Sequence, residues 1–223
     1  MTPKTSQVVS KPLTRAERVR QSSRQRRAQQ KETLRRTILD AAGELFLEFG
    51  YEGFSMRQVA ERIGYSATTI YRYFENKDDL LFAIIREAFI QFGQELAAAA
   101  RTTDDPLARL EALGHAYINF GLQNPIHYQL MFMQRTDFLL VNRDGQKQPM
   151  IDSFKVLQQA VEQAIDAGAI ECGDAETYSE VIWALVHGIT SLAVAKSPRF
   201  TGERVQKNAA LAMRMTLRGL RRE

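Results

Sequence analysis

The segment that follows Gly64 carries side chains whose types and spacing suit contact with nucleic acid. In a helix, at about 100° per residue, one face of this segment is apolar and consists of Ala67, Ile70 and Phe74. The opposite face carries hydroxyl, guanidinium and phenol groups, on Thr68, Thr69, Arg72 and Tyr73, and Tyr71 lies on the boundary. Threonine can approach base edges, arginine can bond guanine or phosphate, and a tyrosine hydroxyl can hold a phosphate oxygen. The pattern therefore favours a DNA-contacting surface over the alternative, the solvated face of an ordinary helical hairpin.

A preceding helix is predicted from Ser55, which can cap its N-terminus, while Gln58 can return the hydrogen bond and complete a capping box. The buried face of this helix follows the spacing i, i+3, i+4 and i+7, at Met56, Val59, Ala60 and Ile63. Gly64 can end the helix in a left-handed conformation, and Ser66 can cap the next helix after a turn of about three residues. The two segments are thus predicted to form a helix-turn-helix.

The segment from about Thr33 to Phe82 resembles the DNA-binding head of the TetR/AcrR family of bacterial regulators. The resemblance rests on the run ILDAAGELFLEFGYEGFSMRQVAERIGYSATTIYRYFENKDDLL, which follows the family pattern nearly throughout. The sequence departs from that pattern in the reading surface, where Tyr65 replaces a small aliphatic residue and Ala67-Thr68 replaces Lys or Pro followed by Gly or Ala. The resemblance therefore implies the fold and leaves the operator sequence open.

Carried over residue by residue, the resemblance implies base contacts from Thr68, Thr69 and Arg72. It implies phosphate contacts from Tyr71, Tyr73 and Lys77, and backbone contacts from Ser55 and Arg57. The whole predicted DNA-contacting set is Ser55, Arg57, Ser66, Ala67, Thr68, Thr69, Tyr71, Arg72, Tyr73 and Lys77. Asn76 can cap the next helix, and Lys77 beside the positive end of that helix would make a local phosphate site. The alternative for Lys77 is a solvated cation next to Asp78 and Asp79.

Composition places the chain among soluble globular proteins, because 44% of its 223 residues are hydrophobic and 25% are charged. No apolar run approaches the roughly 18 residues that span a bilayer. The N-terminus has no signal-peptide core, so we expect a cytoplasmic protein with no membrane partner. A single cysteine, Cys172, excludes an intrachain disulfide and a cysteine-based zinc site. The histidines His115, His127 and His187 lack metal-ligand spacing, and no phosphate loop or nucleophile motif occurs, so we expect no metal, no cofactor and no enzyme activity.

Positive charge is concentrated at the N-terminus. Residues 1–36 contain eleven Lys or Arg and two Glu, a net charge of +9, whereas the whole chain carries +4. Because this segment has almost no large apolar residue before Leu34, we expect residues 1–30 to form a basic arm that is disordered or intermittently helical without DNA. On DNA the arm can lie along the backbone or insert an arginine into a narrow minor groove. The alternative is a solvated tail that only aids solubility.

The rest of the chain is predicted to be all-α. The first helix of the head, residues 31–48, carries one apolar stripe and ends at Gly50. Further helices are predicted at 78–101, 106–122, 125–133, 150–167, 175–195 and 202–221, and the clearest loop at 134–149. We therefore divide the chain into the arm at 1–30, a three-helix DNA-binding domain at 31–78, and a helical-bundle ligand-binding and dimerisation domain at 79–223.

The second domain resembles the WHG type that is attached to some TetR-family heads. The resemblance rests on Asn124-Pro125 followed by HYQLMF, and on the run WALVHG that starts at Trp183. It implies a homodimer, and the last two helices carry enough apolar residues to pack inward and against a partner. In the last helix these residues are Val205, Ala209, Ala212, Met213, Thr216, Leu217 and Leu220. We expect the two helices of each copy to form a four-helix seam that presents two heads to a palindromic operator on double-stranded DNA.

A sensing site is predicted from aromatic, thioether and hydrogen-bonding side chains in helices that should converge. These residues are Tyr117, Phe120, His127, Tyr128, Met131, Phe154, Trp183 and His187. Such groups suit a mostly apolar small molecule, although each of them also fits an ordinary core position. A ligand would act by shifting the helix at 78–101 and the separation of the two heads. The sequence thus predicts a repressor released by a small effector, with a constitutive or architectural DNA-binding protein that has no inducer as the alternative.

Overall fold

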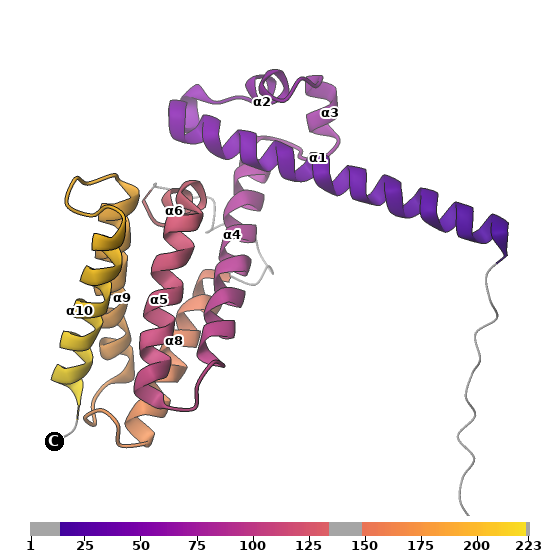
Figure 1. Ribbon diagram of the computed structural model, residues 1–223. Helices are drawn as coiled ribbons and strands as arrows, with labels where there is room; N and C mark the ends of the chain where they lie inside the picture. Colours follow the sequence, from indigo (N-terminus) through magenta and orange to yellow (C-terminus); the bar gives the residue numbers. More distant parts are fainter. Residues whose placement is uncertain (1–13, 134–148, 222–223) are drawn as a thin grey trace, which may run out of the picture.

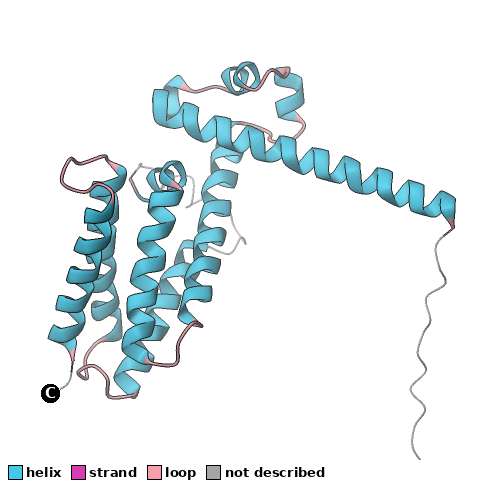
Figure 2. Cartoon of the chain, in the orientation of Figure 1, coloured by secondary structure: helices cyan, strands magenta, loops and turns pink. Residues whose placement is uncertain are grey.

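The computed structural model describes residues 14–133 and 149–221, and this part of the chain is built from helices and contains no strand (Figure 1, Figure 2). Three helices form a head, and the remaining helices form a body that lies beside it (Figure 1). The all-α class is therefore confirmed. The predicted loop at 134–149 lies almost entirely outside the described residues, as do residues 1–13 of the predicted arm.

Helix α1 (Arg15–Gly53) begins well before residue 31, where we predicted the first helix. Its start is fixed by a full capping box, in which Thr14 Oγ1 accepts from the Glu17 N–H and the Glu17 carboxylate accepts from the Thr14 N–H at 2.7 Å. The following Arg, Gln and Ala residues have high helix propensity, so the helix continues without a packed face. Gly50, at φ +70°, interrupts it at the predicted end.

The head packs α2 (Met56–Arg62) and α3 (Ala67–Tyr71) against the second half of α1. The fully or almost fully buried side chains of this small core are Ile38, Ala42, Leu45, Phe46, Phe54, Val59, Ala60, Ile70 and Phe74. Phe46 and Phe54 meet edge to face with ring centroids 6.4 Å apart. Arg62 joins α2 to α1 by ion pairs with Glu48 at 2.9 Å and Glu44 at 3.5 Å. The reading segment therefore rests on a rigid support.

The body begins with α4 (Lys77–Ala100), which leaves the head and packs against α5 (Pro106–Gln123) and α8 (Pro149–Asp166). The hairpin of α9 (Ala175–Val194) and α10 (Glu203–Leu220) closes the other side against α5 (Figure 1). These bounds agree with the predicted ones to within one or two residues. Asn76, Asp105 and Asp174 cap α4, α5 and α9 with their side chains, and these local hydrogen bonds fix where the helices begin.

The short helix α6 (Pro125–Phe132) lies where the head meets the body. It packs on α1 so closely that a Cβ added to Gly43 would lie 3.2 Å from Ile126 Cγ2. On its other sides α6 contacts α4, α5 and α9. It therefore joins the support of the DNA-reading hairpin to the interior of the body.

Candidate DNA-contacting face and effector cavity

The start of α2 is capped by Ser55, but the complete capping box that we predicted does not form. Ser55 Oγ accepts from the Gln58 N–H at 3.3 Å, as expected. The Gln58 side chain does not reach the Ser55 N–H; instead its Oε1 accepts from the Ser55 hydroxyl at 2.8 Å. Both Ser55 and Arg57 are exposed, so their predicted backbone contacts to DNA are sterically open.

The turn between the two helices follows the prediction. Gly64 has φ +73°, in the left-handed region that favours glycine, and the Tyr65 N–H donates to the Ala60 carbonyl at 2.9 Å. Ser66 then caps α3, because its Oγ accepts from the Thr69 N–H at 3.2 Å and lies 2.9 Å from Thr69 Oγ1. Thr69 and Ser66 thus bond each other, which fixes the start of the reading helix.

The exposed face of α3 differs from the prediction at two tyrosines. Thr68 and Arg72 are exposed as expected, and Tyr71, which we placed on the boundary, is 54% exposed. Tyr73 is half-buried and packs against the core. The reason is that α3 ends at Tyr71 and the Tyr73 N–H donates to the Ile70 carbonyl in a tighter i to i+3 turn, so 100° per residue no longer applies. Thr69 and Ala67 are half-buried.

Lys77 has a role inside the head. Its Nζ donates to the Tyr51 carbonyl at 2.9 Å and lies 3.9 Å from the centroid of the Tyr51 ring. The Tyr51 hydroxyl in turn bonds the Asp78 carboxylate, and this hydrogen bond raises the pKa of Tyr51 to about 12. Lys77 thereby ties the end of α1 to the start of α4. An ammonium has three donors, so a phosphate contact by Lys77 stays a prediction.

A cavity of about 530 Å³ lies between α4, α5, α6, α8 and α9. Five of the eight predicted ligand residues line it: Tyr117, Met131, Phe154, Trp183 and His187. The sequence did not single out the other lining residues, which are Phe89, Phe92, Leu96, Phe132, Ser153, Lys155, Leu157, Gln158 and Glu176. Three of these, Phe89, Phe92 and Leu96, belong to the apolar face of α4, and an apolar face in a sequence does not show whether it meets a cavity.

The remaining three predicted ligand residues lie outside this cavity. Phe120 is completely buried and packs on Phe92, with centroids 5.0 Å apart. Tyr128 is also completely buried, behind the cavity wall. His127 points the other way, into a separate polar hollow between α1, α4 and α6, and burial lowers its pKa. On α6 the one-residue step from His127 to Tyr128 turns the side chain by about 100°, which separates the two.

A hydrogen-bonded cluster forms the inner wall of the cavity. His187 Nδ1 lies 2.8 Å from the Tyr128 hydroxyl and 3.0 Å from the Tyr117 hydroxyl, and Trp183 Nε1 donates to Tyr117 at 3.2 Å. On the other side of the imidazole, Nε2 lies 3.2 Å from Ser191 Oγ. Burial lowers the pKa of His187 and raises the pKa of Tyr117 and of Tyr128, so all three are neutral at pH 7. This wall can therefore give and accept hydrogen bonds but offers no charge.

The hairpin of α9 and α10 has an outward apolar stripe that no described residue covers. Large exposed apolar side chains lie on this face of both helices, at Val181 and Leu192 of α9 and at Leu211 and Met215 of α10. Four of the seven residues in the stripe that we predicted for α10 cannot lie in a seam, because Val205, Ala209, Met213 and Leu217 are buried in the core of the same chain. An amphipathic helix has two candidate faces, and periodicity alone does not say which of them meets the chain's own core.

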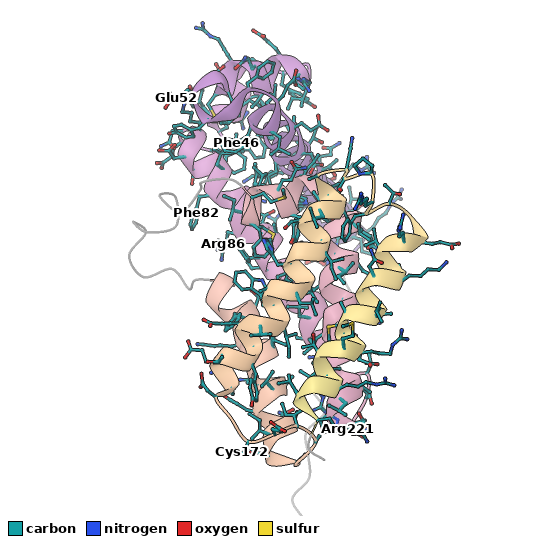
Figure 3. The ribbon with its side chains drawn as sticks, turned by 90° about the vertical axis from the view of Figure 1, so that its left-hand side faces the viewer. Phe46, Glu52, Phe82, Arg86, Cys172 and Arg221 are labelled. Carbon is teal, nitrogen blue, oxygen red and sulfur yellow. The ribbon has the colours of Figure 1, made fainter. Side chains whose placement is uncertain are left out.

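Within the described ranges, no group of three or more His, Cys, Asp or Glu side chains is arranged to hold a metal ion. None of the helices in those ranges is both long and apolar enough to cross a bilayer. Cys172 is exposed and lies, like Arg221, at the end of the body far from the head (Figure 3).

Comparison with known families gives two matches. The family described as bacterial regulatory proteins, tetR family, matches residues 38–84. The family described as tetracyclin repressor-like, C-terminal domain, matches residues 110–218. The first match covers the reading hairpin with its support, and the second covers the helices that carry the exposed apolar stripe and the cavity-lining helices other than α4.

Among characterised relatives, the HTH-type transcriptional activator FasR of Mycolicibacterium smegmatis is 32% identical over 95 residues, which are 43% of this chain and 43% of FasR. The match thus spans less than half the length of that relative. A structure of a protein of unknown function from Rhodococcus sp. RHA1 is 27% identical with a TM-score of 0.67, over 85% of this chain and 96% of that one. The fatty acid degradation regulator FadR from Bacillus halodurans is 19% identical with a TM-score of 0.69, over 85% and 97%. At that identity, the likeness to FadR concerns the fold alone.

Proposed function

The chain belongs to the tetR family of bacterial regulatory proteins, and from this premise we propose that it is a transcription regulator that binds a palindromic operator as a homodimer and leaves it when a small, mostly apolar ligand fills the cavity. Its family and the characterised relative are regulators and not enzymes, in line with the prediction of no enzyme activity. The observation that carries the proposal is the exposed face of α3, on a hairpin whose caps, turn and ion pairs leave it little freedom.

The DNA-reading role is assigned to the residues that the hairpin presents and does not use itself. Thr68, Tyr71 and Arg72 are exposed, and Arg57 lies exposed at the start of α2. Their hydroxyls and guanidinium groups match base edges and phosphates. Ser66, Ala67 and Thr69 stand at the N-terminus of α3, where the backbone comes nearest to a duplex in a helix-turn-helix.

The test of this role begins with selection of bound duplexes from a random pool or with genomic mapping, which yields the operator. Replacing Arg72 or Tyr71 by Ala should then weaken operator binding about 5- to 150-fold, because a good base contact contributes about 1–3 kcal/mol and a hydrogen bond to a charged phosphate about 1.5–3 kcal/mol. Arg101→Ala, an equal loss of charge at the far end of α4, serves as the control. Operator affinity within a factor of two of wild type for both head variants would overturn the assignment.

The ligand proposal rests on the cavity, which is large enough for a small effector molecule. Its interior is lined mainly by aromatic and aliphatic side chains, whereas the exposed Lys155 and Glu176 lie at its rim. The inner wall of Tyr117, Trp183 and His187 is neutral, and a buried ionic group there would stay unpaired at high cost. We therefore assign the site to an apolar molecule whose buried end carries an uncharged hydroxyl or carbonyl group.

The structure connects this cavity with the head through α4 and α6. Phe89 and Phe92 of α4 line the cavity, while Leu80 and Leu81 of the same helix are buried at its head end. A ligand that fits only one position of α4 would change the separation of the two heads in a dimer. A constitutive binder without an inducer, the alternative function, would have a filled core. The cavity favours the ligand-responsive regulator.

Trp183 makes the ligand proposal measurable, because it is the only tryptophan of the chain and lines the cavity. A library of apolar alcohols and ketones can be screened by Trp183 fluorescence, and each hit tested for release of the operator. The sign of regulation follows from a reporter fused to the operator, with repression relieved by the hit as the expected result. Activation, as the name of FasR describes for that relative, would replace the repressor by an activator.

A further inference from the structure

An open groove of about 1060 Å³ separates the N-terminal part of α1 from the reading helix. On the α1 side it is lined by residues between Gln25 and Thr37, a length of about 18 Å at 1.5 Å per residue. On the other side it is lined by Tyr65, Arg72 and Tyr73. The groove therefore runs beside the same Arg72 side chain that the proposed function assigns to DNA, and it lies outside the helix-turn-helix itself.

The lining of this groove is cationic. It contains Arg26, Arg27, Lys31 and Arg72, together with neutral polar side chains, and no carboxylate. Arg26, Arg27 and Lys31 are exposed, and no ion pair within the described part of the chain involves them. A groove of this charge suits a polyanion, and its length corresponds to about five nucleotides of one strand at 3.4 Å each.

The cations continue beyond the groove along α1. Arg20, Arg24, Arg27 and Lys31 are spaced by four, three and four residues, so they share one face of the helix. This part of α1 projects past the head as a single rod (Figure 1). From Arg15 to Thr37 the rod measures about 33 Å, close to the 34–36 Å of one turn of duplex DNA.

The rest of the head cannot supply this positive charge. Residues 37–84 contain four Lys or Arg and eight Asp or Glu, a net charge of −4. Of those four cations, Arg62 is paired with Glu44 and Glu48, and Lys77 bonds the Tyr51 carbonyl. A surface with a net negative charge would repel the phosphates of a duplex. Each phosphate contact needs a cation that displaces a counterion, and residues 37–84 leave few cations free for this.

We propose that the groove holds the sugar–phosphate backbone of the DNA strand that borders the reading helix, and that the basic face of α1 follows the same duplex beyond the half-site. Arg26, Arg27 and Lys31 bind phosphates on one side of the strand, and Arg72 with the hydroxyls of Tyr65 and Tyr73 binds them on the other. This inference rests on the proposed function and adds a second DNA-binding element to it.

A matched pair of variants tests the groove. Gln30 lines it, whereas Ala28 lies on the opposite face of α1, and both positions are exposed. Gln30→Glu and Ala28→Glu add the same charge to the same helix, and glutamate keeps helix propensity. We expect Gln30→Glu to weaken operator binding at least tenfold more than Ala28→Glu at 0.1 M salt. Equal effects of the two variants would overturn the inference.

The salt dependence gives a second measurement. Arg26→Gln/Arg27→Gln should lower the slope of log affinity against log salt by about 1.8 per copy, because each phosphate contact contributes about 0.9. It should also remove hydroxyl-radical protection from nucleotides flanking the half-site and leave protection within it. Arg101→Gln/Arg221→Gln, which removes two exposed charges at the far end of the body, is the control.

The outcomes separate the two proposals. If wild type selects no specific operator, the proposed function itself fails. If wild type binds an operator while the Arg26 and Arg27 variant keeps the wild-type slope and flanking protection, only the groove inference is overturned. A groove variant that changes the oligomeric state and leaves DNA binding intact would assign the groove to a second copy of the chain and also overturn the inference.

Discussion

Two residues of α10 distinguish the dimer seam from the core of the subunit. Met215 is 67% exposed, whereas Leu217, two positions along the same helix, is 5% exposed. About 200° separates their side chains around the helix axis. If the exposed stripe of α9 and α10 forms the seam of a homodimer, Met215→Glu should affect association alone and Leu217→Ala should affect folding alone.

The magnitudes follow from burial. Truncating a buried leucine costs about 2–5 kcal/mol of folding free energy, so Leu217→Ala should lower the melting temperature by about 4–20 °C. An exposed Met215→Glu should change folding by less than about 0.5 kcal/mol. In a seam, however, each carboxylate must be desolvated, and its effective penalty is several kcal/mol per ion. A net loss of about 4 kcal/mol would raise the dimer dissociation constant about 1000-fold.

The assay is analytical ultracentrifugation at micromolar concentration, with circular dichroism and thermal melting on the same samples. Met215→Glu should sediment as a monomer with wild-type helicity and melting, and Leu217→Ala should melt early while it stays dimeric below its transition. Met215→Leu, which keeps the position apolar, should behave as wild type. A Met215→Glu variant that dimerises as tightly as wild type would refute the seam, and one that unfolds would refute the exposure of Met215 in the subunit.

The remaining predictions concern the interior. Because burial lowers the pKa of His187 below its ordinary value of 6.5, stability should be full above pH 6.5 and fall as the pH drops through the folded-state pKa. His187→Asn should make this decline less steep, although His127 still contributes to it. If the melting temperature of His187→Asn depends on pH as that of wild type does, His187 is excluded as a source of the decline. Gly121→Ala should destabilise the folded protein by about 1–3 kcal/mol, because the added Cβ would collide with Thr190 and Tyr128. Gly93→Ala, whose Cβ would have its nearest neighbour 3.8 Å away, should be neutral or stabilising. Equal melting temperatures of the two variants would contradict the packing of α5 on α9.

Features that depend on neighbours in sequence were predictable. Ser55, Ser66 and Asn76 cap helices because an N-cap needs only a side-chain oxygen and the next turn of backbone. Gly64 ends α2 because a left-handed residue is needed there. The helix-turn-helix and most helix bounds were therefore correct, since each rests on a local interaction of a few residues.

Features that depend on tertiary placement were not predictable in the same way. Leu217 and Met215 both lie on apolar stripes of α10, and only the packing of α10 on α5 and α9 decides which is covered. His127 and Tyr128 were assigned to one site, although the turn of about 100° between them places His127 in a separate hollow and Tyr128 beside His187. Tyr71 and Tyr73 were misplaced because α3 ends at Tyr71 and a tighter turn follows.

The cavity contains residues that the sequence revealed and residues that it did not. Trp183 and His187 were found because a polar group on an apolar helix is conspicuous in a sequence. Phe89 and Leu96 were missed as lining residues because an apolar stripe has the same sequence signature whether it faces another side chain or an empty volume. The cavity arises from the way α4, α5, α6, α8 and α9 pack together, which no local sequence pattern encodes.

Several polar side chains of the reading hairpin, among them Ser55, Arg62 and Ser66, form the hydrogen bonds and ion pairs that fix its shape, so a single head has few side chains left for DNA. A second copy across the seam and the basic groove of α1 each supply contacts that one head lacks, and the two sources lie in separate parts of the chain. Met215→Glu removes the first and Gln30→Glu the second. Because a dimer carries two grooves and a monomer only one, Gln30→Glu should cost the Met215→Glu monomer about half of the binding free energy that it costs the dimer. A combined variant that binds no worse than either single one would mean that the groove engages DNA only in the dimer.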